Sequence, residues 1–188
     1  MTKNQEIHIE TDRFILRRLT IDDAMPQYLS WLDEQSRQGF ILSAREKISI
    51  QQLREYIAER SCRNDVIFFG IFTRDQKCHI GNIKFEPVNY LLKYAVMGIL
   101  IGEPRWRGLG VTPEVIMASA EWLDVQFGIS QIILGVDINN TQAIKSYQKS
   151  GFAIEKTDKI KVDENQAISM VMHLNKSHLL ITAENILD

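Results

Sequence analysis

The chain has 188 residues, of which 45% are hydrophobic and 24% are charged, and its formal net charge is −2. This length and composition are typical of one globular domain with a full hydrophobic core. The small negative charge argues against nucleic acid or an anionic membrane as the main partner, and the longest apolar runs are too short to cross a bilayer.

No apolar segment typical of a secretory signal follows Met1, so we expect a cytoplasmic protein. The two cysteines, Cys62 and Cys78, do not form a C-x-x-C pair, which predicts reduced thiols and no metal site. We expect one domain over residues 1–175 and a C-terminal tail over residues 176–188. The protein is expected to be a monomer or a homodimer.

Apolar and polar residues alternate near the start of the chain, which predicts a strand over residues 7–18. Thr20 is a suitable N-cap for a helix over residues 21–32. A polar, irregular loop with a short helical piece is expected over residues 33–47. A second helix is predicted over residues 49–60, because its apolar residues share one face.

Three strands are predicted next, over residues 65–73, 78–85 and 96–101, with residues 90–94 in a connection. The helix that follows is the clearest in the chain. Its predicted N-cap is Thr112, Pro113 occupies its first position, and Gly128 is expected to end it.

The rest of the chain alternates strands and a helix. Strands are predicted over residues 131–136, 152–156 and 167–174, and a short helix that Asn140 caps is predicted through residue 148. The strand–helix–strand unit over residues 96–136 predicts a right-handed parallel crossover. The fold class is therefore α/β, with a mixed sheet.

A glycine-rich loop precedes the clearest helix, and it contains Arg105, Arg107, Gly108 and Gly110. A helix N-terminus offers unpaired backbone N–H groups and a partial positive charge, and phosphates bind there readily. The glycines allow a close approach of the backbone. The segment therefore predicts a site for a phosphate-bearing ligand at the end of a strand.

Two known phosphate loops do not match. A Walker loop needs Lys followed by Ser or Thr after its last glycine, where this chain has Val111 and Thr112. The dinucleotide fingerprint G-x-G-x-x-G needs a glycine where this chain has Pro113. The remaining interpretation is a pyrophosphate held by backbone amides in the pattern R-x-x-G-x-G.

Three segments together resemble the GNAT superfamily of N-acetyltransferases. The segment from Arg105 to Gly110 matches its coenzyme A signature Q/R-x-x-G-x-G/A. The segment from Asn140 to Phe152 matches a second family element, in which an asparagine precedes a short helix with a tyrosine and then Gly-Phe. Residues 10–17 are similar to the opening Thr-x-Arg-Leu-x-Leu-Arg of the branch that contains the ribosomal-protein N-terminal acetyltransferases.

This resemblance covers nearly the whole chain and implies a mostly antiparallel sheet with a central, splayed parallel pair. It also implies acetyl-CoA as co-substrate, without a metal. Edge amides of the strand before the loop would hold the pantetheine arm, and amides of the loop would hold the pyrophosphate. Tyr147 would lie near the sulfur. The implied contact residues are Ile99, Leu100, Ile101, Arg105, Trp106, Arg107, Gly108, Leu109, Gly110, Val111, Thr112, Asn140, Ala143 and Tyr147.

The implied reaction is the direct attack of an amine on the thioester. Tyr147 is the expected general acid for the leaving thiolate, although its spacing from Ile144 also fits simple packing against the sheet. The N–H of Leu100 is the first candidate for the oxyanion. Trp106 could stack on adenine or pack under the loop.

The general base is left open. Glu86 is preferred because it ends a strand that borders the expected acceptor cleft, while Glu103, Asp137, His79 or water are the alternatives. The opening motif favours a peptide or protein N-terminus as the acceptor. A small-molecule amine, such as an aminoglycoside, a polyamine or an amino sugar, and a non-catalytic coenzyme A-binding module are the competing interpretations.

Overall fold

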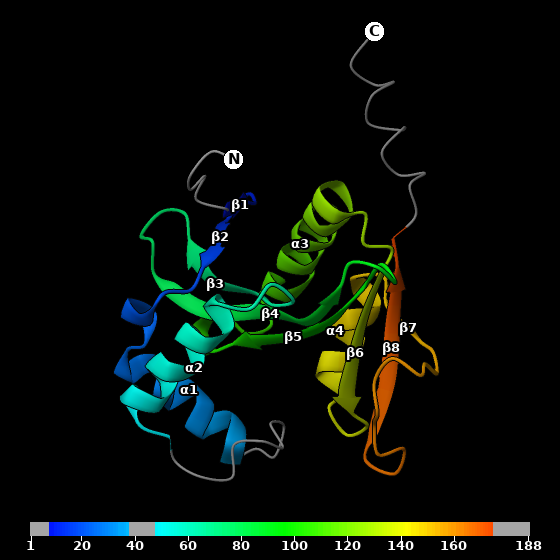
Figure 1. Cartoon of the computed structure of the whole chain (residues 1–188). Helices are drawn as coiled ribbons and strands as arrows, with labels where there is room; N and C mark the ends of the chain where they lie inside the picture. Colours follow the sequence, from blue (N-terminus) through cyan, green and yellow to red (C-terminus); the bar gives the residue numbers. More distant parts are fainter. Residues whose placement is uncertain (1–7, 38–47, 175–188) are drawn as a thin grey trace, which may run out of the picture.

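The computed structural model describes residues 8–37 and 48–174, except for the side chains of residues 34–37 (Figure 1). Eight strands form one sheet in the order β1-β2-β3-β4-β5-β6-β8-β7. All neighbours are antiparallel except β5 and β6. The strands are β1 (His8–Glu10), β2 (Phe14–Arg18), β3 (Ile67–Thr73), β4 (His79–Asn89), β5 (Tyr94–Ile101), β6 (Gln131–Asp137), β7 (Ala153–Ile154) and β8 (Ala167–His173).

Helices cover both faces of this sheet (Figure 1). They are α1 (Pro26–Arg37), α2 (Ile50–Ser61), α3 (Val111–Phe127) and α4 (Thr141–Lys149), with short 3-10 turns at η1 (Ile21–Asp23) and η2 (Pro104–Trp106). One buried core joins the sheet to α3, and a second joins its other face to α1 and α2. Strand β3 is buried along its whole length because it contributes side chains to both cores.

The predicted splayed pair is confirmed. Strands β5 and β6 pair in parallel only from Tyr94–Gln131 to Val96–Ile133. Beyond that point β5 stays paired with β4 as far as Ile101, and β6 stays paired with β8 as far as Asp137. The two strands diverge in Figure 1, so the outer edge of β5 faces a gap in the middle of the sheet.

The predicted first helix is wrong in its bounds. Thr20 starts the short turn η1, and α1 begins only at Pro26, whose missing N–H is tolerated in a first helical turn. Helix α1 then continues to Arg37, into the segment predicted to be a loop. Residues 38–47 of that segment lie outside the described residues, as does the predicted tail at 176–188.

The strands also differ from their predicted bounds. Strand β4 continues to Asn89 because an irregularity between Phe85 and Val88 keeps it paired with β5. The connection is therefore shorter than predicted, and β5 begins at Tyr94. The predicted strand at 152–156 is reduced to Ala153–Ile154.

Candidate functional site

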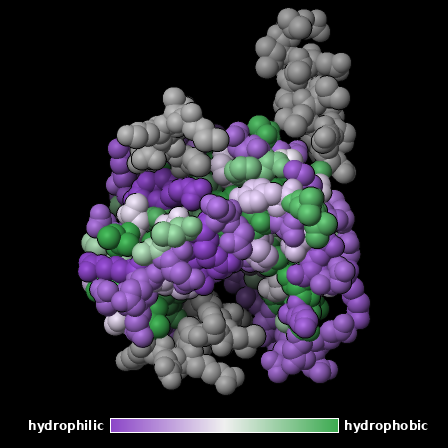
Figure 2. Space-filling view, viewed as in Figure 1, coloured by the Kyte–Doolittle hydropathy of each residue, from purple (hydrophilic) through white to green (hydrophobic). Residues whose placement is uncertain are grey.

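A cavity of about 600 Å³ lies where β5 and β6 diverge. Figure 2 shows this point as a hollow between the part of the molecule with α1 and α2 and the part with α4 and β6. Most of the implied contact residues line it, namely Ile99, Leu100, Ile101, Trp106, Arg107, Gly108, Gly110, Val111, Thr112, Asn140, Ala143 and Tyr147. Of the other expected site residues, Arg105, Leu109 and Glu86 are not among its lining residues.

The glycine loop gives α3 an open N-terminus at this cavity. Gly108 and Gly110 both have φ of 75°, a backbone conformation that other residues adopt at a cost. Gly110, rather than the predicted Thr112, is the N-cap of α3, and no side chain caps the helix there. The first backbone N–H groups of α3 therefore remain available for a ligand.

The two arginines of the loop have different surroundings. Arg107 donates from Nε to the carbonyl oxygen of Ile101 at 3.0 Å and from Nη2 to that of Gly102 at 2.7 Å. It thus ties the loop to the end of β5. Arg105 has a largely exposed side chain 3.7 Å from Glu103. Trp106 packs edge-on against Phe14, which agrees with the packing interpretation.

The direction of the backbone amides along β5 decides which of them face the gap. The N–H of Gly102 donates to Ile80 of β4, and the carbonyl of Lys93 accepts from the β6 side of the sheet. Because successive residues of a strand point their amides to alternate sides, Leu100 faces β4 and Ile99 faces the gap. The geometry therefore directs the N–H of Ile99, and not that of the expected Leu100, toward the gap.

Helix α4 forms the opposite wall of the cavity. The side chain of Asn140 accepts from the N–H of Ala143 at 3.2 Å and so caps the helix as predicted. Two lysines that were not predicted, Lys145 and Lys149, also line the cavity. Their spacing from Gln142, at i+3 and i+7, places all three on one helical face, and this spacing is visible in the sequence.

Tyr147 lies on α4 and lines the cavity. Its ring packs at 5.9 Å from that of Phe152, while its hydroxyl makes no hydrogen bond to any residue in the described part of the chain. Burial raises the pKa of this hydroxyl to about 12. Tyr147 is therefore protonated at neutral pH and has a hydrogen-bond donor available at the cavity.

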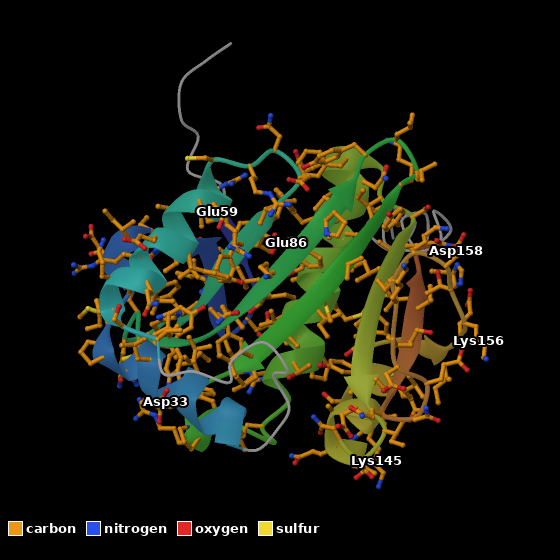
Figure 3. The ribbon with its side chains drawn as sticks, turned by 60° about the horizontal axis from the view of Figure 1, so that its bottom comes forward. Asp33, Glu59, Glu86, Lys145, Lys156 and Asp158 are labelled. Carbon is orange, nitrogen blue, oxygen red and sulfur yellow. The ribbon has the colours of Figure 1, made fainter. Side chains whose placement is uncertain are left out.

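Glu86 is surrounded by cations instead. Its carboxylate contacts Lys84 at 2.7 Å and Arg60 at 3.1 Å, and it also pairs with Arg63. Burial alone would raise the pKa of Glu86, but the hydrogen bond from Lys84 and the three positive charges together lower it. Figure 3 shows Glu86 near α2, well separated from Lys145 on α4. This environment disfavours the expected role of Glu86 as a general base.

The other base candidates also have partners. His79 donates from Nε2 to the carbonyl of Gly81 at 2.9 Å, and burial lowers its pKa to about 4. Glu103 accepts from Gln27 at 2.8 Å. The carboxylate of Asp137 accepts from the N–H of Asn139 at 2.7 Å. Each of these groups is engaged in holding local structure.

Two properties of the described residues, 8–37 and 48–174, bear on other functions. None of their helices is both long enough and apolar enough to span a membrane. They contain no group of three or more His, Cys, Asp and Glu side chains that could hold a metal ion.

Comparison with known proteins identifies the family. A family model described as "Acetyltransferase (GNAT) domain" matches residues 13–153. An N-acetyltransferase of Bacillus subtilis, YoaA, whose role is uncharacterised, is 29% identical over 149 residues, which are 78% of this chain and 83% of YoaA.

Two solved structures from Vibrio cholerae have the same fold. A spermidine N-acetyltransferase in complex with CoA and spermine matches with a TM-score of 0.72 at 20% identity, covering 85% of this chain and 95% of the other. A protein assigned as a ribosomal-protein-serine acetyltransferase matches with a TM-score of 0.69 at 18% identity, covering 93% and 100%. With the family match over most of the chain, these findings show that the protein belongs to the GNAT acetyltransferase family and is an N-acetyltransferase.

Proposed function

We propose that this enzyme transfers the acetyl group of acetyl-CoA to a primary amine in the cavity between β5 and β6. One observation carries the proposal. A strand edge whose amides lack a β6 partner, an open helix N-terminus and a tyrosine hydroxyl that makes no hydrogen bond to the described residues all meet at this cavity.

The residues present fit the parts of coenzyme A. Its pyrophosphate would lie against Gly108, Gly110 and the first N–H groups of α3, where the helix dipole favours negative charge. Lys145 and Lys149 on the opposite wall would add positive charge. The pantetheine arm would follow the outer edge of β5, whose amides have no β6 partner there.

The reaction needs few protein groups. The amine nitrogen attacks the thioester carbonyl carbon, so that a C–N bond forms and the C–S bond breaks. The N–H of Ile99 would stabilise the charge on the carbonyl oxygen. Tyr147 would give its proton to the departing sulfur. The proton lost from the amine passes to water, and the tyrosine is reprotonated from solvent.

A peptide or protein N-terminus is the acceptor that we favour. An α-amine has a pKa of about 7.7–8.0, so a sizeable share is neutral at pH 7, whereas a lysine-like amine has a pKa near 10.4. An α-amine therefore depends less on a protein base, and the carboxylates of Glu86, Glu103 and Asp137 are all engaged elsewhere. The fold similarity to the protein assigned as a ribosomal-protein-serine acetyltransferase supports this choice.

A polyamine is the second candidate, since the fold also matches a spermidine N-acetyltransferase. A panel of short peptides with free N-termini, N-blocked peptides containing lysine, polyamines, aminoglycosides and amino sugars would separate these acceptors. Free coenzyme A thiol is measured with time. Turnover with free N-termini but not with N-blocked peptides is the expected result. Turnover confined to polyamines would exclude the peptide acceptor. Tight binding of coenzyme A without turnover of any amine would favour a binding module.

A further inference from the structure

The turn between β1 and β2 contacts the glycine loop and the first turn of α3. The N–H of Arg13 donates to Oε1 of Glu114 at 3.0 Å, and its Nε donates to Oε2 at 2.7 Å. Its Nη1 donates to the carbonyl oxygen of Leu109 at 2.9 Å. The hydroxyl of Thr11 donates to Glu114 at 2.6 Å. One arginine therefore joins the loop, the helix and the N-terminal turn.

The contact to Leu109 restrains a flexible part of the loop. Leu109 lies between Gly108 and Gly110, and both glycines have φ of 75°. Glycines leave the backbone many alternative conformations, and fixing one of them has an entropic cost. A hydrogen bond from the charged guanidinium to the carbonyl between them favours a single conformation before any ligand binds.

The contact to Glu114 concerns charge. Glu114 lies in the first turn of α3, where the helix dipole attracts negative groups. Burial alone would raise its pKa, but the hydrogen bonds from Thr11 and Arg13 outweigh that effect and lower it. Its carboxylate is thus ionised at neutral pH, at the helix end that would receive a diphosphate. Arg13 compensates that charge through a contact of 2.6 Å between Nη2 and Oε2.

We propose that Arg13, assisted by Thr11, is a positioning residue for the diphosphate of coenzyme A, although neither side chain lines the cavity. It holds the glycine loop in its binding conformation and neutralises the carboxylate of Glu114. This inference rests on the proposed binding of coenzyme A at the end of α3. It also gives a physical role to the Thr-x-Arg segment at the start of the chain.

The test measures the Kd of coenzyme A by isothermal titration with the full-length protein. Arg13→Ala should raise the Kd about tenfold, because it removes charge-assisted hydrogen bonds to both the loop and Glu114. The KM for acetyl-CoA should rise similarly while kcat changes less than about threefold. Arg13→Lys keeps the charge without the planar fork and should give an intermediate Kd. Adding Glu114→Gln to Arg13→Ala should restore part of the affinity.

Arg74→Ala is the matched control. The Arg74 guanidinium donates to the carbonyl of Thr11 at 2.9 Å and pairs with Glu10 at 3.3 Å. It therefore contacts the same turn, and among the described residues it makes no hydrogen bond or ion pair with α3. The Kd of coenzyme A for Arg74→Ala should stay within about twofold of the wild-type value. An equal loss in both variants, or no loss in either Arg13 variant, would overturn the proposal. If Arg13→Ala does not fold, the Kd of coenzyme A for Arg13→Lys, compared with that of the wild type, tests the proposal. A wild type that does not bind coenzyme A would instead refute the proposed function itself.

Discussion

Replacing Tyr147 by Phe should separate catalysis from stability. The hydroxyl makes no hydrogen bond within the described residues, and the contact with the Phe152 ring is kept. Since no internal hydrogen bond is lost, the free energy of unfolding should change by less than about 1 kcal/mol. The loss of a general acid should lower kcat about 100-fold, which corresponds to about 2.7 kcal/mol of activation free energy.

The pH dependence of this variant adds a second test. Tyr147 acts in its protonated form, and burial raises its pKa to about 12. Its contribution is therefore present below that pKa and lost only above it. Between about pH 6 and pH 10 the ratio of wild-type to variant kcat should be constant, because the hydroxyl does not titrate in that range.

Release of free thiol at saturating acetyl-CoA and acceptor is the measurement, with circular dichroism and urea unfolding to follow stability. Tyr28→Phe is the control, because Tyr28 is buried on the other face of the sheet and its oxygen accepts from Asn82 at 2.9 Å. A Tyr147→Phe enzyme with unchanged kcat would refute the acid role. A lower free energy of unfolding with an unchanged kcat would assign Tyr147 a packing role.

Three further substitutions test the surroundings of the site. Tyr28→Phe should lower the free energy of unfolding by about 1–3 kcal/mol, since Asn82 is left buried without its partner, while kcat of the folded enzyme is kept. Glu86→Gln should cost about 1–2 kcal/mol at pH 7, because three cations lose their counter-charge, with kcat nearly unchanged. The stability difference between the wild type and this variant should be fully present above the ordinary carboxyl pKa of 4.5. It should disappear as the pH falls through the lowered pKa of Glu86 in the folded protein, and urea unfolding at a series of pH values measures it. Gly102→Ala should destabilise the protein by about 1–3 kcal/mol in thermal unfolding, since a Cβ there would lie 2.0 Å from the Trp31 ring; a wild-type midpoint would contradict this.

The sequence predicted the local backbone structure around the cavity well where short-range chemistry determines it. The glycines of the loop, the cap of Asn140 and the end of α3 at Gly128 follow from short-range backbone requirements that a pattern shows directly. The start of α1 was missed because residues 21–25 form a separate turn before Pro26. Here a proline marked the helix start more reliably than Thr20 did.

Long-range contacts could not be predicted in this way. Glu86 follows the predicted end of a strand, which made it a plausible base, but it lies within β4, and Arg60 and Arg63 reach it from α2 and the loop that follows. The partners Arg13 and Glu114 are 101 residues apart and meet only in the fold. In the sequence each of these side chains resembles an ordinary surface charge, because a local pattern does not show which distant residue a side chain contacts.

The location of the reacting centre depends on where one strand pairing stops. Both β5 and β6 stay largely apolar past their last shared pair, Val96 and Ile133, so the hydrophobic pattern by itself does not mark the point where the parallel pairing ends. Past that pair β5 stays paired with β4 and β6 with β8, and the two halves of the sheet diverge (Figure 1). The same register fixes that Ile99, and not Leu100, directs its N–H into the gap. Under the proposed function, coenzyme A therefore occupies the position of a missing strand neighbour. A shift of the β4–β5 register by one residue would turn the N–H of Ile99 toward β4 and present that of a neighbouring residue to the gap, without changing any side chain of the loop.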